Sequence, residues 1–166
     1  PSTIKNIMAV IKDGGAVGIF PEGNRSFFGE TGYFKPTIGK LAKKMKVPLV
    51  IVNIRGGFNT APRWRKKPSK GRMTAAVTKI ISPEDMANMT DGEINDAISR
   101  GISFNEYEYN AKKKIKFKGK KKAEHIEAAL FACPECGSFK GLHGEGNDLY
   151  CSECGARVRF DEYGFF

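Results

Sequence analysis

Four cysteines in the last quarter of the chain form its most specific chemical pattern. They lie in two Cys-x-x-Cys-Gly segments, Cys133–Gly137 and Cys151–Gly155, with 14 residues between Cys136 and Cys151. Each segment can turn so that two sulfurs point at one centre, and the glycine lets the backbone fold back so that amides can donate to sulfur. Four thiolates around one tetrahedral ion leave no open position. The pattern therefore predicts a structural zinc site in a zinc ribbon, with ligands Cys133, Cys136, Cys151 and Cys154.

Alternative uses of these cysteines fit the pattern less well. A redox dithiol would need one exposed pair beside a βαβ unit, whereas this chain has two paired segments. His143 could act as a substitute ligand, but four cysteines already complete the set, so we interpret it as a loop residue. Residues 133–166 are too few to bury a core. Metal binding, worth about 10–16 kcal/mol in small zinc peptides, would then supply the folding free energy.

A second candidate site is the polar loop Phe20-Pro21-Glu22-Gly23-Asn24-Arg25-Ser26. Arg25 offers a guanidinium fork that suits phosphate, and Glu22 offers a carboxylate for hydroxyl groups. Gly23 allows close approach of the backbone to a ligand. From residue types alone, the alternative is a turn in which Glu22 and Arg25 simply pair with each other.

The apolar pattern around this loop predicts an α/β fold. The runs Ala16–Phe20 and Leu49–Ile54 are short and continuous, as expected for strands buried on both faces. Helical spacing lies between them, at Ile38, Leu41, Ala42 and Met45. A strand, a helix and a strand in this order predict a parallel, right-handed βαβ unit, and ligands bind at the carboxyl ends of such strands.

Further elements are expected on both sides of this unit. Helical spacing at Ile4, Ile7, Met8 and Ile11 predicts a first helix that ends at Gly14-Gly15, and residues 73–81 read as a strand. Ser82-Pro83 predicts the start of a short helix, with proline at its first position. Thr90 and Glu93 fit a capping box for a helix that reaches about Arg100. A short helix is expected over residues 123–131.

The loop at residues 20–26 resembles the Phe-Pro-Glu-Gly-Thr-Arg-Ser motif of the lysophosphatidic acid acyltransferases, part of the glycerolipid acyltransferase family. The likeness covers about residues 1–81, including Lys12–Gly15, Phe34–Pro36 and Val47–Val52, with Asn24 in place of Thr and Ile51 in place of Pro. The resemblance implies that the loop binds the phosphate of a lysophospholipid acceptor, chiefly through Glu22 and Arg25, with Gly23, Asn24 and Ser26 beside them. It also implies acyl-CoA or acyl carrier protein as the donor, and a role in phospholipid biosynthesis.

In that family, catalysis belongs to an upstream Asn-His-x-x-x-x-Asp motif, whose His accepts the proton of the acceptor hydroxyl while the Asp orients the imidazole. No such motif precedes Phe20, so we expect no catalytic residue in this chain and interpret it as N-terminally truncated. His143 and Asp148 have the right spacing, but they lie inside the cysteine-rich segment, and Leu142 stands where the motif has Asn. We interpret them as loop residues.

The positive charge of the chain is concentrated outside the cysteine-rich segment. Residues 1–132 hold 25 basic and 12 acidic side chains, whereas residues 133–166 hold 3 and 6. This imbalance favours anionic partners, namely phosphorylated molecules, an anionic membrane surface or nucleic acid. Trp64 among the cations of residues 63–72 favours a membrane surface, and the eight lysines of residues 112–122 are interpreted as a solvated face or a guarded edge strand.

These patterns combine into one hypothesis and one alternative. The hypothesis is the C-terminal part of an acyltransferase-like α/β domain over residues 1–110, a lysine-rich linker and short helix over 111–132, and a four-cysteine zinc ribbon over 133–166. Reduced thiolates and apolar runs too short to cross a bilayer predict a cytoplasmic protein that is peripheral to the membrane. The alternative is a zinc-ribbon nucleic-acid-binding protein, although its ribbon would be acidic.

Overall fold

The computed structural model describes residues 2–166, which pack into two units with separate hydrophobic cores. The helical unit comprises the described residues up to Asn24, together with residues 32–53 and 76–103. The cysteine unit comprises residues 25–31, 54–75 and 104–166. The chain therefore passes between the two units several times, and one such passage falls between Asn24 and Arg25, inside the loop at residues 20–26.

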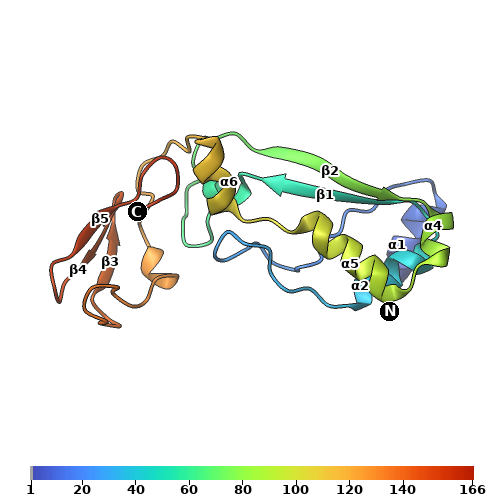
Figure 1. Ribbon diagram of the computed structural model, residues 1–166, viewed down its shortest axis with the longest axis horizontal. Helices are drawn as coiled ribbons and strands as arrows, with labels where there is room; N and C mark the ends of the chain where they lie inside the picture. The colour runs from blue at the N-terminus through green and yellow to red at the C-terminus, as the bar shows by residue number, and fades with distance from the viewer. Residues whose placement is uncertain (1) are drawn as a thin grey trace. The chain divides into compact units, whose positions relative to one another are not determined.

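The helical unit contains α1 (Ser2–Lys12), α2 (Thr37–Met45), α4 (Pro83–Asn88) and α5 (Asp91–Ile102). Helices α2 and α5 lie side by side (Figure 1), and a glycine permits their close contact. The Gly39 amide donates to Asn95 Oδ1 at 2.7 Å, and a Cβ at Gly39 would lie 2.5 Å from the Asp91 carbonyl oxygen. The core of this unit is aliphatic, with buried residues Ile51, Ile81, Met86, Ile94, Ala97 and Ile98.

Both predicted capping patterns are confirmed. Ser82 Oγ accepts a hydrogen bond from the Asp85 amide at 3.0 Å, and Pro83 occupies the first turn of α4. Thr90 Oγ1 accepts from the Glu93 amide at 3.2 Å, while Glu93 Oε2 accepts from the Thr90 amide at 2.7 Å. This reciprocal pair satisfies two N–H groups that a helix start otherwise leaves without partners.

Strands β1 (Leu49–Arg55) and β2 (Thr74–Ile81) form a two-stranded sheet and run in opposite directions (Figure 1). Thr78 Oγ1 donates to the Ile51 carbonyl oxygen at 3.2 Å. Both strands were predicted, but the expectation that β1 is buried on both faces is wrong. Ile51 is buried, whereas Val50 and Val52 on the opposite face are exposed.

The strand predicted at Ala16–Phe20 is not formed, so the expected parallel βαβ unit is absent from the described residues. The segment belongs to neither sheet, and its apolar side chains face solvent, with Phe20 75% exposed. An apolar run becomes a buried strand only when a neighbouring strand pairs with its backbone and other elements cover its faces. Neither condition is met here, so the apolar run alone does not make a strand.

The cysteine unit contains α3 (Gly57–Thr60), α6 (Glu106–Lys113), a 3₁₀ helix η1 (Ile126–Ala128) and strands β3 (Leu142–Glu145), β4 (Asp148–Cys151) and β5 (Arg157–Arg159). The three strands form an antiparallel sheet in the order β3-β4-β5. The helix expected over residues 123–131 is reduced to η1, and α6 was not predicted. The core is mixed, with buried residues Phe58, Trp64, Ala123, Ile126, Ala129, Cys133, Leu142, Leu149, Cys151 and Phe160.

A buried carboxylate joins α6 to α3. Glu106 is only 3% exposed, and its Oε1 accepts a hydrogen bond from the Gly56 amide at 2.8 Å. Burial raises the pKa of the Glu106 carboxyl above its ordinary value, although hydrogen bonds from Gly56, Phe58 and Asn59 act in the opposite direction. The carboxylate thus supplies acceptors to the N-terminal amides of a four-residue helix whose own side chains provide no cap.

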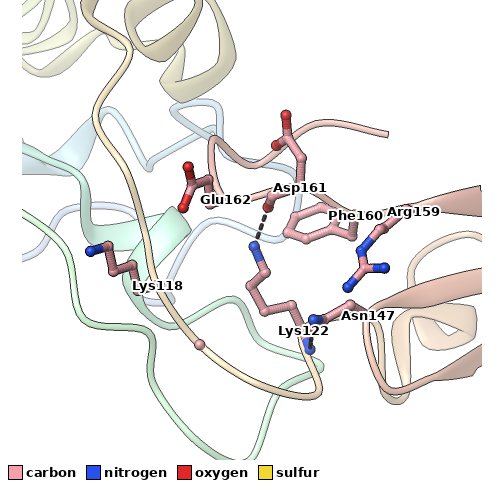
Figure 2. A pocket seen from close by; sticks show the side chains of 8 residues that line it. Lys118, Lys122, Asn147, Arg159, Phe160, Asp161 and Glu162 are labelled. Atoms are coloured by element: carbon pink, nitrogen blue, oxygen red, sulfur yellow. Dashed lines mark hydrogen bonds between the residues drawn. The ribbon is translucent and has the colours of Figure 1, made fainter.

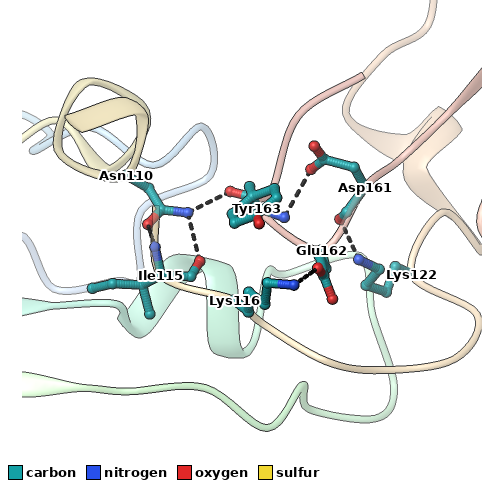
Figure 3. A network of polar contacts seen from close by, with 7 residues as sticks. All are labelled: Asn110, Ile115, Lys116, Lys122, Asp161, Glu162 and Tyr163. Atoms are coloured by element: carbon teal, nitrogen blue, oxygen red, sulfur yellow. Dashed lines mark hydrogen bonds and ion pairs between the residues drawn. The ribbon is translucent and has the colours of Figure 1, made fainter. Parts of the chain in front are cut away.

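A polar network ties the end of the chain to α6 (Figure 3). Asn110 is buried, and its Nδ2 donates to the carbonyl oxygens of Ile115 and Tyr163, while its Oδ1 accepts from the Ile115 amide at 2.8 Å. Lys116 and Glu162 form an ion pair in the same network. The segment after β5 is therefore held to α6 by the hydrogen bond from Asn110 to the Tyr163 main chain and to the neighbouring residues by the ion pair of Glu162.

Candidate functional site

The two cysteine segments form matching turns within the cysteine unit. The Gly137 amide donates to the Cys133 carbonyl oxygen at 2.9 Å, and the Gly155 amide donates to that of Cys151 at the same distance. Both glycines have positive φ angles, 72° and 76°, which confirms the predicted reason for glycine at these positions. The amide of each first cysteine also bonds the carbonyl oxygen five residues later, at 2.9 Å for Cys133 and 2.8 Å for Cys151.

The four sulfurs converge in the way a tetrahedral ion requires. All lie within 4.8 Å of one another, and Sγ–Sγ distances are 3.8 Å for Cys133–Cys154 and 3.8 Å for Cys136–Cys151. A zinc–sulfur bond of about 2.3 Å places tetrahedral sulfurs about 3.8 Å apart, whereas a disulfide needs about 2.05 Å. The cysteines are free thiols in this geometry. They could hold one metal ion, and their spacing is consistent with structural zinc.

Each turn contributes one buried and one exposed cysteine. Cys133 and Cys151 belong to the hydrophobic core, whereas Cys136 and Cys154 face solvent. Hydrogen bonds from the main-chain amides of Cys136 and Glu135 lower the pKa of Cys133 to about 7. Amide donation toward sulfur favours the thiolate, which is the form that binds a metal.

His143 does not form a catalytic pair with Asp148, the aspartate five residues further on. His143 Nε2 lies 3.4 Å from Ser152 Oγ, and its ring contacts Tyr150 across the β3–β4 ladder. Asp148 instead forms an ion pair with Arg157 at 2.8 Å. A carboxylate that orients an imidazole must bond its ring nitrogen, so His143 and Asp148 are residues of the small sheet, in line with their interpretation as noncatalytic.

The first half of the loop at residues 20–26 belongs to the helical unit. The Gly23 amide donates to the Phe20 carbonyl oxygen at 3.0 Å, which closes a turn, and Gly23 has a φ angle of +71°. The half-buried Glu22 accepts a hydrogen bond at Oε2 from the Gly32 amide at 2.5 Å. One carboxylate oxygen is thereby fixed to the main chain.

The second half of the loop belongs to the cysteine unit. The exposed Arg25 donates from Nη1 to the Ala61 carbonyl oxygen at 3.0 Å, and Ser26 Oγ donates to that of Glu30 at 2.6 Å. Glu22 and Arg25 therefore each bond a main-chain group, which differs from the alternative in which they pair with each other. A guanidinium carries five N–H donors, so one bond to a carbonyl leaves Arg25 able to donate elsewhere.

The basic segments differ from expectation at two residues. Trp64 is 8% exposed, packs edge-on against Phe58 and donates from Nε1 to the Lys122 carbonyl oxygen at 3.3 Å, so it is a core residue and cannot anchor a membrane surface. Lys122 is also buried, whereas the other lysines of residues 112–122 are exposed. Lys70 and Lys118 exchange main-chain hydrogen bonds at 2.7 and 2.8 Å as an isolated bridge, so the edge strand considered for residues 112–122 is not formed. No signal in a run of eight lysines could single out the buried one.

The comparisons with known proteins give one match. Residues 1–55 match a protein-family model described as Acyltransferase, and this stretch includes the loop at residues 20–26 and β1. No curated protein and no solved structure matches the chain. The match supports an acyltransferase family and a role in acyl transfer, and it ends well before the cysteine site. No helix within residues 2–166 is both long enough and apolar enough to span a membrane.

Proposed function

We propose that this chain is part of an acyltransferase that moves a fatty acyl group from an acyl thioester to the free hydroxyl of lysophosphatidic acid, in phospholipid biosynthesis. The observation that carries the proposal is the sequence Phe20–Ser26, which lies within the stretch that matches the Acyltransferase family. Acyl-CoA or acyl carrier protein is the proposed donor, because the resemblance of this loop to lysophosphatidic acid acyltransferases implies a thioester substrate.

The proposed acceptor site uses Glu22 and Arg25. Arg25 would bind the acceptor phosphate, because a guanidinium forms charge-assisted, bidentate hydrogen bonds to phosphate oxygens. Glu22 has one carboxylate oxygen bonded to the Gly32 amide, and the other would accept from an acceptor hydroxyl. Gly23, Asn24 and Ser26 would shape the loop around the ligand. None of the described histidines is proposed as the catalytic base.

Two further parts of the proposal concern the surroundings of this site. The exposed cations among residues 63–72, namely Arg63, Lys66, Lys67, Lys70 and Arg72, would attract an anionic membrane, where the lipid acceptor resides. Zinc at Cys133, Cys136, Cys151 and Cys154 would have a structural role, because four thiolates leave no position for substrate. The protein is thus proposed to be cytoplasmic and peripheral to the membrane.

The test is binding of lysophosphatidic acid to the 166-residue chain, compared between wild type and Arg25→Ala. Losing a charge-assisted hydrogen bond is worth about 1.5–3 kcal/mol, so affinity should fall about ten- to a hundredfold. Arg25→Lys, which keeps the charge but not the fork, should fall in between. Isothermal titration with monomeric, short-chain lysophosphatidic acid measures the affinity, and circular dichroism checks that each variant folds.

The matched control is Arg100→Ala, which removes the same charge from an exposed position on α5. Equal losses in Arg25→Ala and Arg100→Ala would mean that only net charge matters, and unchanged affinity in Arg25→Ala would remove Arg25 from the site. Tight binding to RNA or DNA, with none to lysophosphatidic acid or anionic vesicles, would favour the nucleic-acid-binding alternative.

A further inference from the structure

The cysteine unit contains a polar pocket with a volume of about 280 Å³ (Figure 2). It lies between the β3–β4 turn, the end of β5 and the segments before and after the small sheet, and Phe160 is its one apolar side chain. The pocket includes no residue of the loop at 20–26. Its lining residues are Lys118, Gly119, Lys122, Asn147, Arg159, Phe160, Asp161 and Glu162.

The two acidic residues of the lining have their carboxylates engaged elsewhere. The Asp161 carboxylate accepts from the amides of Tyr163 and Phe165 at 2.8 and 2.9 Å and points away from Lys122 in Figure 2. The Glu162 carboxylate pairs with Lys116, which is not a lining residue (Figure 3). Lys122 reaches the main-chain oxygen of Asp161 instead of its carboxylate.

The cations of the pocket are therefore poorly neutralised. Ion pairs within residues 2–166 join Lys116 to Glu162, Lys121 to Glu124 and Arg157 to Asp148, and none involves Lys122, Arg159 or Arg65. Lys122 is 4% exposed, and this burial is the main reason that the pKa of its ammonium is lowered. The nearby Asp161 and Glu162 raise this pKa, and the nearby Arg65 and Arg159 lower it. A buried cation without a carboxylate partner is costly, and a bound anion would offset that cost.

A fourth cation, Arg65, lies next to the lining residue Gly119. Arg65 Nη1 donates to Ser69 Oγ at 2.6 Å, and its Nη2 lies 3.0 Å from the position that a Cβ at Gly119 would take. Its Nε is buried and has no hydrogen-bond partner among the described residues. Burial also lowers the pKa of this guanidinium. Gly119, with no side chain, thus leaves room beside the guanidinium of the half-buried Arg65.

We propose that this pocket binds the terminal phosphate of a phosphomonoester, through Lys122 and Arg159 with Lys118 at its edge. A phosphomonoester is close to a dianion at neutral pH and carries three acceptor oxygens, which matches several converging cationic donors. The volume lies just below the range of small-molecule sites, about 300–1,000 Å³, so the pocket suits a phosphate group with a small attached group rather than an acyl chain. The Asn147 side chain accepts from the Lys122 amide at 2.9 Å, which leaves its NH₂ as a further donor.

The test is titration of the zinc-loaded 166-residue chain with three probes at physiological ionic strength. Inorganic phosphate and methyl phosphate should bind with similar affinity, and dimethyl phosphate, which carries a single charge, at least about tenfold more weakly. Amide chemical shifts of Gly119, Asn147 and Phe160 should move in the same titration. Binding of dimethyl phosphate or of a short RNA in preference to both phosphate probes would overturn the proposal, because it would indicate a phosphodiester site.

Two variants locate the site. Arg159→Gln, at an exposed position of β5, should weaken binding of methyl phosphate at least about tenfold. Its control is Arg157→Gln on the same strand, which removes the same charge from an arginine that does not line the pocket. Unchanged affinity in Arg159→Gln, or equal losses in the two variants, would overturn the proposal. Lys122→Met should abolish binding, with retained zinc and Trp64 fluorescence as the check on folding.

The result of this test can be distinguished from the result of the test of the proposed acceptor site at residues 20–26. In the titration with methyl phosphate, Arg25→Ala should leave the shift changes of the Gly119, Asn147 and Phe160 amides as they are in the wild type, whereas Arg159→Gln should reduce them. If Arg25→Ala lost methyl phosphate binding while Arg159→Gln kept it, the phosphate would be assigned to the loop at residues 20–26. The pocket would then be removed as a separate site.

Discussion

The two units of this chain achieve stability in different ways. The helical unit buries aliphatic side chains between α2, α5 and the inner face of its strands, yet it leaves many apolar side chains exposed, including Val17, Ile19 and Phe20. The cysteine unit has little regular structure, and its core combines aromatic residues with Cys133 and Cys151. The first unit depends on helix packing, whereas the second depends on side chains that also form a candidate metal site.

The two regions also differ in whether they match a protein family and in how completely their elements are paired and packed. The stretch that matches a family, residues 1–55, includes the unpaired apolar segment at residues 16–20 and a strand with one exposed apolar face. The cysteine region lies outside the family match, yet both of its turns are closed by hydrogen bonds and its sulfurs converge. A match to a family model therefore indicates a class of reaction, but it does not indicate which parts of the chain are well packed.

The largest expected effect comes from breaking the metal site. Cys133→Ser should release the metal and unfold the cysteine unit, because metal binding worth about 10–16 kcal/mol in small zinc peptides is comparable to the whole stability of a typical domain. Elemental analysis should give one zinc per wild-type chain and none in the variant. Fluorescence of Trp64, the only tryptophan, should report the opening of the core that it shares with Cys133.

Ser152→Ala is the control for this change, because Ser152 lies between the cysteines of the second turn and is exposed. It should keep both the zinc and the fluorescence of the wild type. A wild-type chain that contains no zinc and is stable after treatment with a chelator would contradict a metal-dependent core.

A smaller effect is expected from the contact between α2 and α5. Gly39→Ala would place a Cβ 2.5 Å from the Asp91 carbonyl oxygen and 2.8 Å from Asn95 Oδ1, so the helices must shift. Overpacking of this kind costs about 1–3 kcal/mol. The loss should appear as faster amide hydrogen exchange in α2 and α5. The control Gly92→Ala meets only Thr90 Oγ1 at 3.8 Å, and its exchange rates should stay the same or fall.

The smallest effect is a pH dependence at Glu106. Because its pKa is raised in the folded chain, its contribution to stability is fully present below the ordinary value of 4.5 and is lost as pH rises through the folded value. Glu106→Gln removes this dependence. Relative to wild type, the denaturation midpoint of the variant should therefore rise as pH increases from the ordinary pKa of 4.5 through the raised folded value. Glu108→Gln, at an exposed position of the same helix, should show no such trend.

The sequence predicted those features that depend on neighbouring residues. The caps at Ser82 and Thr90 and the turns at Gly137 and Gly155 follow from local hydrogen bonds and backbone angles, and all four are present. The convergence of the four sulfurs followed because the spacing within each turn nearly fixes where two sulfurs point.

The sequence failed where the outcome depends on distant partners. The run Ala16–Phe20 has the composition of a buried strand, but strand formation needs a neighbour that local pattern does not specify. Trp64 and Lys122 were interpreted from the cations around them, whereas contacts with Phe58, Phe160 and Asp161 decide their burial. Helix α6 was missed because its sequence, EYEYNAKK, has no apolar stripe.

The placement of Cys133 and Cys151 in the hydrophobic core has a consequence for how this protein responds to its surroundings. A ligand that binds only the folded state stabilises it by mass action, so each tenfold rise in free metal concentration above the dissociation constant adds about 1.4 kcal/mol. Since the buried sulfurs and the aromatic core form one cluster, a metal bound by these sulfurs would be gained or lost together with the packing. The melting temperature of the cysteine unit would then follow the free zinc level of its compartment rather than being a constant of the sequence.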